Sequence, residues 1–314
     1  MNILVIADPI AGFKTYKDST YAIMQAAHRA GHTLWFCQQT DLFAAPTVSA
    51  HAAQLALHED PAHWYSVVST EDRALASFDA VLMRKDPPFD TEYFYATHLL
   101  SRAEVQGARV FNTGQALRDH PEKLAILEFP ELAPTTLVTA DNARIKAFIA
   151  EHSDVILKPL DGMGGTGIFR VRAGDPNVNV ILETLTRLGR DTIMAQVYLP
   201  AITEGDKRIL LIDGEPVPFC LARIPQGGET RGNLAAGGRG EARALSDSDW
   251  RIARAAAAKL AGRGLFLVGL DVIGDKLTEV NVTSPTCFQE IQQQTGFDVA
   301  GMYVQALERR VAQG

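Results

Sequence analysis

The stretch RILLIDGEPVPF, residues 208–219, decides the fold of the second half of the chain. Its Asp213-Gly214 pair lies between two apolar segments, which is the strongest short signal for a β-hairpin. A second hairpin is predicted at Gly274-Asp275, between LDVI and KLTEVNV, and an alanine-rich helix is predicted over residues 246–263. This region is therefore predicted to be α+β and largely antiparallel.

The region just upstream also mixes helices and strands. It begins near Pro121, which suits the first position of a helix. The predicted elements are helix 141–152, strand 154–158, a glycine loop, strand 168–172, helix 178–188 and strand 191–198.

The first 120 residues follow a different pattern, in which strands alternate with helices. The pattern predicts strand 2–7, a helix from Asp18 or Ser19 to Gly31, strand 33–37, a polar stretch with histidines, strand 80–83, helix 91–106 and strand 108–111. Such alternation is typical of a doubly wound α/β domain.

The composition limits the class of protein. A chain of 314 residues with 46% hydrophobic content suggests roughly two domains. A formal net charge of −7 argues against nucleic acid as the main partner. No segment approaches the ~20 apolar residues of a membrane span. The three cysteines, Cys37, Cys220 and Cys287, are widely spaced and odd in number, so they fit neither a disulfide framework nor a zinc site. Free cysteines predict a reducing compartment, and hence a cytoplasmic protein.

The glycine loop at residues 162–167, GMGGTG, matches the G-x-G-x-x-G fingerprint of dinucleotide sites, with Glu183 at about the required distance. That fingerprint must open a helix, whereas residues 168–171 favour a strand. We therefore interpret the loop as a hairpin turn whose backbone N–H groups cover phosphates. Lys158, just before the loop, is placed to meet phosphate charge. The alternative is a turn that is merely flexible.

Glu279 and Asn281 lie two residues apart on a predicted strand, so their side chains share one face and could both bind a hard cation such as Mg²⁺. Asp271 on the partner strand is the natural third ligand. It lies opposite Glu279 only if the turn has three residues, ending at Lys276, or if the hairpin contains an equivalent bulge. The alternative is that these are ordinary hairpin carboxylates.

The first hairpin supplies positive charge. A two-residue turn pairs Ile212 with Glu215 and, four residues earlier, Arg208 with Phe219. Arg208 and Arg223 then share a face, about 13 Å apart along the sheet, and their long side chains could close around one phosphoryl group. The alternative is that both arginines are simply solvated at the surface.

These groups together predict phosphoryl transfer from a magnesium nucleotide. They comprise Lys123 and Lys158, the glycine turn, the two arginines and the acid/amide set. No serine or cysteine nucleophile with a recognisable elbow is present, and the histidines lack metal-ligand spacing.

Long segments across essentially the whole chain resemble the ATP-grasp ligases, and among them the bacterial glutathione synthetases. The segments are ADPIAGFKTYKDS, VLMRKDPPFDTEY, DVILKPLDGMGG, YLPAITEGDKRILLIDGEPVPFCLARIPQGGETRGNLAAGGRGE and VGLDVIGDKLTEVNVTSPT. The resemblance implies that ATP phosphorylates the C-terminal carboxylate of γ-glutamylcysteine. Glycine then attacks the acyl phosphate to give glutathione, ADP and phosphate.

The resemblance also implies the architecture. A Rossmann-like, pre-ATP-grasp domain for substrate binding is expected over residues 1–120, and a two-lobed ATP-grasp fold over residues 121–314. The first lobe, 121–198, carries the glycine-rich phosphate loop. The second lobe, 199–314, carries the metal site and a lid loop at 224–241. The partners are expected to be small molecules, neither nucleic acid nor membrane, and a homo-oligomer is expected.

Site roles follow from the same resemblance, residue by residue. The residues expected to contact ATP are Lys123, Lys158, Gly164, Gly165, Gln196, Val197, Tyr198, Leu199 and Asp206. The expected ligands of Mg²⁺, or of Mn²⁺, are Asp271, Glu279 and Asn281, and the arginines expected to neutralise the transferring phosphoryl group and the tetrahedral intermediate are Arg208 and Arg223.

The second-substrate site is expected around Ser284, and Arg84 is a candidate donor to the dipeptide carboxylates, with a salt bridge to Asp86 or Asp90 as the alternative. Residues 223–241, RIPQGGETRGNLAAGGRGE, contain too few apolar residues to be ordered by burial. They are interpreted as a lid that excludes water from the acyl phosphate. Its side chains expected to touch the substrates are Arg231 or Asn233.

Two other functions stay open. Another ATP-grasp carboxylate–amine ligase, joining D-alanines or adding residues to a protein tail, would share the metal and phosphate groups. A nucleotide-binding regulator without catalysis is the alternative from a different class.

Overall fold

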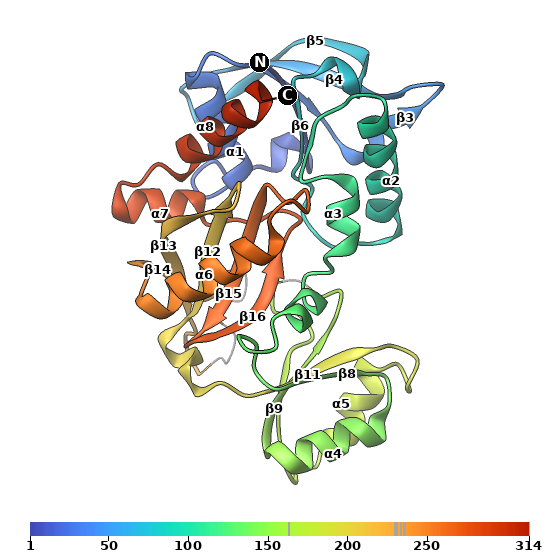
Figure 1. The fold of residues 1–314 in the computed structure, drawn as a ribbon, viewed down its shortest axis with the longest axis vertical. Helices are drawn as coiled ribbons and strands as arrows, with labels where there is room; N and C mark the ends of the chain where they lie inside the picture. Colours follow the sequence, from blue (N-terminus) through green and yellow to red (C-terminus); the bar gives the residue numbers. More distant parts are fainter. Residues whose placement is uncertain (163, 229–231, 233, 235–236, 314) are drawn as a thin grey trace.

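The computed structural model describes residues 1–162, 164–228, 232, 234 and 237–313, and three β-sheets organise this part of the chain (Figure 1). The N-terminal sheet has seven strands in the order β3-β4-β2-β1-β6-β7, with β5 paired to β4. Its strands are β1 (Asn2–Ile6), β2 (Thr33–Cys37), β3 (Leu42–Ala44), β4 (Val48–Leu57), β5 (Tyr65–Ala74), β6 (Ala80–Met83) and β7 (Val110–Phe111).

Helices cover both faces of this sheet, as the alternating pattern predicts. Strands β2, β1, β6 and β7 are parallel. The helix α2 (Thr91–Val105) packs with Leu4 and Ile6 of β1, whereas α1 (Ser19–Arg29) packs with Ile3 and Val5 on the other face. A short helix α3 (Gly114–Asp119) follows β7. The Rossmann-like prediction is therefore confirmed.

The stretch between β2 and β6 differs from the prediction. It forms β3 and the long antiparallel hairpin of β4 and β5, where a polar stretch without strands was expected. The physical reason is the position of β5 beyond β4, where most of its side chains are exposed. A solvated strand carries no apolar alternation for a sequence pattern to detect.

A second, four-stranded sheet has the order β10-β9-β11-β8. Its strands are β8 (Thr136–Thr139), β9 (Asp154–Pro159), β10 (Phe169–Arg172) and β11 (Ile193–Val197), and its helices are α4 (Asn142–His152) and α5 (Val178–Leu185). Residues of both helices pack on one face against Val155 and Leu157. The pairing of β10 with β9 confirms that a strand, and not a helix, follows the glycine loop.

The third sheet contains both predicted hairpins and has five strands in the order β14-β13-β12-β15-β16. The strands are β12 (Asp206–Ile212), β13 (Glu215–Ile224), β14 (Arg239–Ala244), β15 (Leu267–Ile273) and β16 (Lys276–Asn281). The alanine-rich helix α6 (Asp247–Leu260) buries Ile252, Ala253 and Ala256 against one face. Short 3₁₀ turns are η1 (Ile10–Gly12), η2 (Gln39–Asp41), η3 (Leu75–Ser77), η4 (Leu124–Glu128) and η5 (Pro200–Glu204).

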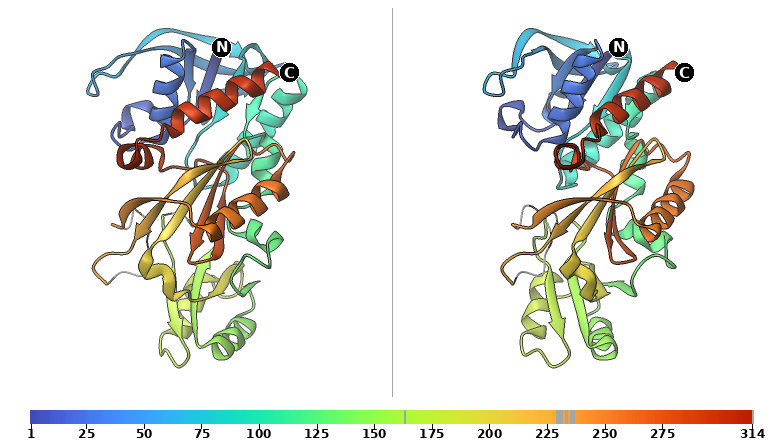
Figure 2. Two further views of the ribbon diagram at one scale, coloured as in Figure 1. Left: turned by 60° about the vertical axis from the view of Figure 1, so that its left-hand side comes forward. Right: turned by 90° about the vertical axis from the view of Figure 1, so that its left-hand side faces the viewer.

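The five-stranded sheet lies between the other two sheets along the long axis of the molecule (Figures 1 and 2). Of the last two helices, α7 (Phe288–Thr295) lies against β14 and β13 and also touches α1, whereas α8 (Val299–Ala312) returns to the N-terminal domain beside α1. Tyr303 and Leu307 of α8 share one buried cluster with Ile3 and with Ile212. The two ends of the chain consequently lie at the same end of the molecule. No helix in the described ranges is long and apolar enough to cross a membrane.

Candidate active site

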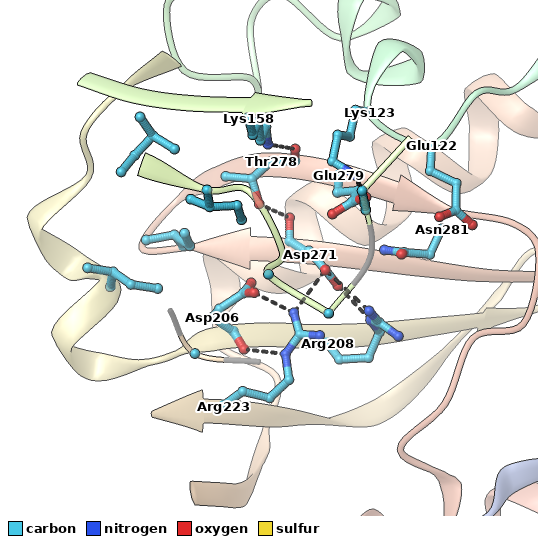
Figure 3. A pocket seen from close by; sticks show the side chains of 18 of the residues that line it. Glu122, Lys123, Lys158, Asp206, Arg208, Arg223, Asp271, Thr278, Glu279 and Asn281 are labelled. Carbon is cyan, nitrogen blue, oxygen red and sulfur yellow. Dashed lines mark hydrogen bonds and ion pairs between the residues drawn. The ribbon is translucent and has the colours of Figure 1, made fainter. Parts of the chain in front are cut away.

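A cavity of about 440 Å³ lies where the four-stranded and five-stranded sheets face each other. The four-stranded sheet presents Ile156, Lys158 and Gln196 to it, on the face opposite its helices. The five-stranded sheet presents a face of charged side chains (Figure 3). The wall formed by the four-stranded sheet therefore combines apolar and polar side chains, whereas the wall formed by the five-stranded sheet is strongly polar.

The charged face results from strand register. Residues directly opposite each other in antiparallel strands share a face. Asp206 of β12 lies opposite Arg223 of β13. Arg208 of β12 lies opposite Asp271 of β15, which in turn lies opposite Glu279 of β16. Four neighbouring strands thus direct three acidic and two basic side chains at one cavity.

The register of the first hairpin confirms one predicted pair and overturns another. Ile212 pairs with Glu215 as expected, but Arg208 pairs with Leu221 and not with Phe219. A bulge between Ile209 and Leu211 shifts β13 by two residues.

A shift of two residues keeps the same face, so Arg208 and Arg223 still share a face, as predicted. They are two residues apart along the strands, about 7 Å, where about 13 Å was predicted. The bulge brings the two guanidinium groups close enough to share one carboxylate.

The second hairpin confirms that Asp271 faces Glu279, through a bulge and not through a longer turn. Ile273 pairs with Lys276, so the turn has two residues, and the register shifts between Asp271 and Val272. The extra residue is Thr278, whose hydroxyl donates a hydrogen bond to the backbone oxygen of Asp271 at 3.1 Å.

Asp271 and Asp206 hold the two arginines in a buried cluster. The Asp271 carboxylate accepts from Arg208 Nε at 2.5 Å and from Arg223 Nη2 at 2.9 Å, and Arg223 Nη2 also donates to Asp206 at 2.5 Å. Burial alone would raise the pKa of Asp271, but the two guanidinium groups hold it well below its usual range. Burial raises the pKa of Asp206 to about 6 against the opposing effect of Arg223. Two acids and two guanidinium groups therefore balance each other.

The two lysines predicted to meet phosphate charge both reach this cavity. Lys123 Nζ donates to the backbone oxygen of Gly162 at 2.5 Å and to Glu279 Oε1 at 3.1 Å. Lys158 Nζ donates to the backbone oxygen of Thr278 at 3.3 Å. Burial lowers the pKa of Lys158, although the nearby Glu279 charge opposes this effect. An anionic ligand would relieve that burial penalty by supplying a counter-charge.

The glycine turn and the strand end predicted to hold ATP also line the cavity. Gly164 and Gly165 line it with φ of 61° and 85°, a left-handed backbone that favours glycine. The cavity is also lined by Gln196, Val197, Tyr198 and Leu199, and by Asp206. Tyr198 is held from outside, because Arg170 lies 3.5 Å from the centre of its ring and Asp154 accepts two hydrogen bonds from that guanidinium.

Of the residues predicted to bind the second substrate, only some line the cavity. Ser284 lines the cavity, and its hydroxyl donates to the backbone oxygen of Arg84 at 3.3 Å. Arg84 is buried behind it, where it donates to Thr20 Oγ1 at 3.2 Å and to the backbone oxygen of Pro285 at 3.0 Å. The Arg84 side chain thus supports the turn that carries Ser284. The predicted Arg231 and Asn233 lie outside the described residues.

The donor set for a divalent cation fits by its chemistry. Asp271, Glu279 and Asn281 offer carboxylate and amide oxygens on one face, the ligands that Mg²⁺ prefers. Asn281 Nδ2 donates to the backbone oxygen of Gly269 at 3.3 Å, which leaves its amide oxygen for a ligand. Across residues 1–313, less the gaps given above, no group of three or more histidine, cysteine, aspartate and glutamate side chains could hold a metal. Asn281 is thus the third oxygen donor of this set, beside two carboxylates.

One residue of the site escaped the sequence patterns. Glu122 Oε1 accepts hydrogen bonds from the backbone N–H groups of Val282 at 2.9 Å and Thr283 at 3.0 Å, and from Thr283 Oγ1 at 2.8 Å. Burial raises the pKa of Glu122, and the negative charge of Glu279 raises it further. Its only sequence signal is its position beside Lys123.

Comparisons with known proteins find relatives over essentially the whole chain. The family model of the prokaryotic glutathione synthetase ATP-grasp domain matches residues 122–296, and the model of the N-terminal domain matches residues 1–118. Glutathione synthetase of Bordetella parapertussis is 60% identical over 314 residues, which covers 98% of this chain and 99% of the relative. Glutathione synthetase of Escherichia coli (strain K12) is 54% identical over 310 residues, with 98% of each chain covered.

Solved structures show the same fold at low identity. D-cycloserine synthetase DcsG has a TM-score of 0.69 at 18% identity, over 98% of this chain and 99% of that one. The ATP-grasp ligase PsnB, complexed with minimal precursor, Mg and ADP, has a TM-score of 0.63 at 19% identity, over 99% of this chain and 98% of that one.

Proposed function

We infer the mechanism from the premise that the chain belongs to the prokaryotic glutathione synthetase family. It is an ATP-dependent ligase that forms a C–N bond to make glutathione. Its substrates are small molecules that include ATP, and it requires a divalent metal, as such enzymes generally do. The convergence of two lysines and two arginines on one cavity carries the proposed division of roles.

In the proposed first step, a carboxylate oxygen of γ-glutamylcysteine bonds to the γ-phosphorus of ATP while the bond to the ADP oxygen breaks. In the second step, the glycine nitrogen attacks the acyl carbon, phosphate leaves and the nitrogen loses its proton. Both steps place new negative charge on oxygen, so fixed cations aimed at the reacting centre lower both barriers.

The lysines and the glycine turn are proposed to hold the phosphates of ATP. Lys123 and Lys158 are buried at the cavity, and an ammonium group in such a place gains most from a charged ligand. Backbone N–H groups of Gly164 and Gly165 can approach phosphate oxygens because no Cβ intervenes. The strand end at 196–199 is proposed to bind adenine, and Asp206 the ribose.

The arginine pair is proposed to neutralise the transferring phosphoryl group and the tetrahedral intermediate. Arg208 and Arg223 are held by Asp271 before any ligand binds, so their orientation is already fixed. A preorganised donor needs little rearrangement during the reaction, which is why such groups accelerate it. Asp206 and Asp271 keep the site near neutrality in the absence of substrate.

Asp271, Glu279 and Asn281 are proposed to hold Mg²⁺, with Mn²⁺ as a substitute. When bound, the ion neutralises phosphate charge. Glu279 accepts from Lys123 through Oε1 in the ligand-free arrangement, and its other carboxylate oxygen would be the one to hold the ion.

The turn after β16, with Ser284, is proposed to bind the second substrate, and Arg84 to support it or to reach the dipeptide carboxylates. The lid loop 224–241, with Arg231 or Asn233, is proposed to close over both. We also propose domain limits at residues 1–120 and 121–314, a homo-oligomer and a cytoplasmic location. The free and buried state of all three cysteines supports the last of these.

A phosphate-release assay with a substrate panel tests the proposal. Release is expected when ATP, Mg²⁺, γ-glutamylcysteine and glycine are all present, with one glutathione formed for each phosphate. If phosphate is released only with another carboxylate–amine pair, such as two D-alanines, then γ-glutamylcysteine and glycine are not the substrates. ATP binding without any ligation would support a regulator instead.

A further inference from the structure

Two adjacent residues, Glu122 and Lys123, connect the two halves of the cavity. One half, here called the phosphate side, contains the glycine turn and the residues proposed to bind the ATP phosphates. Lys123 lies on this side, where its ammonium group donates to the backbone oxygen of Gly162 and to Glu279. Glu122 contacts the turn that follows β16, where the proposed function places the second substrate. We propose that Glu122 is a positioning residue that fixes the acceptor turn, residues 282–286, relative to the phosphate-binding Lys123. This inference rests on the proposed function.

The side-chain hydrogen bonds of Glu122 converge on one oxygen atom. Three donors converge on Oε1: the N–H groups of Val282 and Thr283 and the hydroxyl of Thr283, at 2.9, 3.0 and 2.8 Å. The backbone oxygen of the same residue accepts from the N–H of Val280 at 3.0 Å. Three hydrogen bonds to one oxygen atom hold Val282 and Thr283 against Glu122, and this clamp defines the path of the turn.

The turn needs such a clamp because of where it lies in the sheet. Among the strands that the structure describes, β16 lies at the edge of its sheet, so its outward N–H groups have no strand partner there. Beyond Asn281 the chain leaves the sheet, and buried N–H groups must find other acceptors. Glu122 supplies one acceptor for two successive N–H groups, as a strand partner would do for one.

Other hydrogen bonds of the acceptor turn join it to the N-terminal part of the chain. Asn112 Nδ2 donates to the backbone oxygen of Val282 at 2.8 Å, and Arg84 donates to that of Pro285 at 3.0 Å. Both donors belong to the part of the chain that forms the N-terminal sheet and its connections. Among the described residues, Glu122 is therefore the side chain whose hydrogen bonds tie this turn to the segment that carries Lys123.

The link matters because the two half-reactions share one intermediate. The acyl phosphate forms on the phosphate side and must be attacked by an amine bound at the acceptor turn. A misplacement of about 1 Å between reacting groups can lower a rate by about 100-fold. A displaced amine leaves the acyl phosphate to water, so loss of Glu122 should separate ATP consumption from glutathione formation.

The test compares Glu122→Ala, Glu122→Gln and the control Glu128→Ala. Glu128 lies on the same segment, and its carboxylate pairs with Arg263 at 2.8 Å, away from the turn. The readouts are ADP formed per glutathione, the KM for glycine and the KM for ATP. Glu122→Ala should raise the ADP to glutathione ratio well above one and raise the KM for glycine about 10-fold or more. The KM for ATP should change much less.

Glutamine keeps an oxygen at the Oε1 position, so Glu122→Gln should restore most of the coupling, and Glu128→Ala should keep a ratio of one. If Glu122→Ala does not fold, Thr283→Val and Thr283→Ser test the hydroxyl hydrogen bond to Glu122 alone, because only serine keeps the hydroxyl, and the ADP to glutathione ratio should rise in Thr283→Val and not in Thr283→Ser. A proportional fall in kcat with a ratio of one and unchanged KM values would overturn the proposal. Failure of the wild-type protein to make glutathione would overturn the proposed function instead.

Discussion

Replacing Asp271 by asparagine should destabilise the ligand-free protein much more than replacing Glu279 by glutamine, although both are proposed to hold the same cation. The Asp271 side chain is 5% exposed and serves two guanidinium groups. Asparagine keeps the size of the side chain but removes its charge. Arg208 and Arg223 then remain buried with only Asp206 to balance them, and uncompensated buried charge is strongly unfavourable.

The expected magnitude follows from these contacts. Breaking a buried ion pair by removing one partner lowers the free energy of unfolding by about 3–5 kcal/mol, and the retained amide oxygen places Asp271→Asn near about 3 kcal/mol. An unfolding entropy of about 2.1 cal/mol/K per residue gives ~0.66 kcal/mol/K for this chain, so Tm should fall by about 4–5 °C. Glu279 is 21% exposed and, among the described residues, forms an ion pair with Lys123, so solvent screening limits its effect to about 1 kcal/mol, or ~1–2 °C.

Thermal unfolding followed by circular dichroism at pH 7, without ATP or metal, measures both values. Glutathione formation should be abolished in both variants, whereas only Asp271→Asn should melt markedly earlier. A melting temperature of Asp271→Asn equal to that of the wild type would refute the stabilising role of the buried cluster. An equally large fall for Glu279→Gln would show that Glu279 is needed for folding.

Two further outcomes are expected. Arg231 and Arg239 should be early trypsin sites in the free enzyme and become protected by ATP, Mg²⁺ and dipeptide; equal cleavage in both states, compared on a denaturing gel, would contradict a closing lid. Burial raises the pKa of every cysteine thiol, so the thiols stay protonated at pH 8, and Ellman's reagent should find none reacting rapidly in the native protein and three after unfolding; a rapid native thiol would contradict the burial of Cys37, Cys220 and Cys287.

Much of the candidate site could be predicted because its chemistry depends on residue type and on strand parity. A two-residue period is enough to place Arg208 and Arg223 on one face. Their separation could not be predicted, because the bulge beside Leu210 arises from packing between strands and leaves no mark in the turn residues. The bulge at Thr278 could be anticipated. With a two-residue turn at Gly274-Asp275, Asp271 can lie opposite Glu279 only if the hairpin contains one extra residue.

Other features could not be predicted because their cause lies outside the local sequence. The hairpin of β4 and β5 has an exposed outer strand, so its composition resembles that of a loop. Glu122 acts on Val282 and Thr283, which lie 160 and 161 residues further along the chain. Nothing near Glu122 indicates those partners, and only the folded chain brings the segments together.

The return of α8 to the N-terminal sheet has a consequence for biosynthesis. A ribosome makes β1 long before α8, yet Ile3 and Val5 share their buried cluster with Tyr303, Val304 and Leu307. Part of the first domain therefore stays uncovered until α8 has been made. Newly made N-terminal segments usually fold as they emerge, but this one must wait for a helix that lies almost 300 residues further along the chain. A ribosome stalled a few codons before α8 would hold a chain with an exposed apolar surface, a natural target for chaperones.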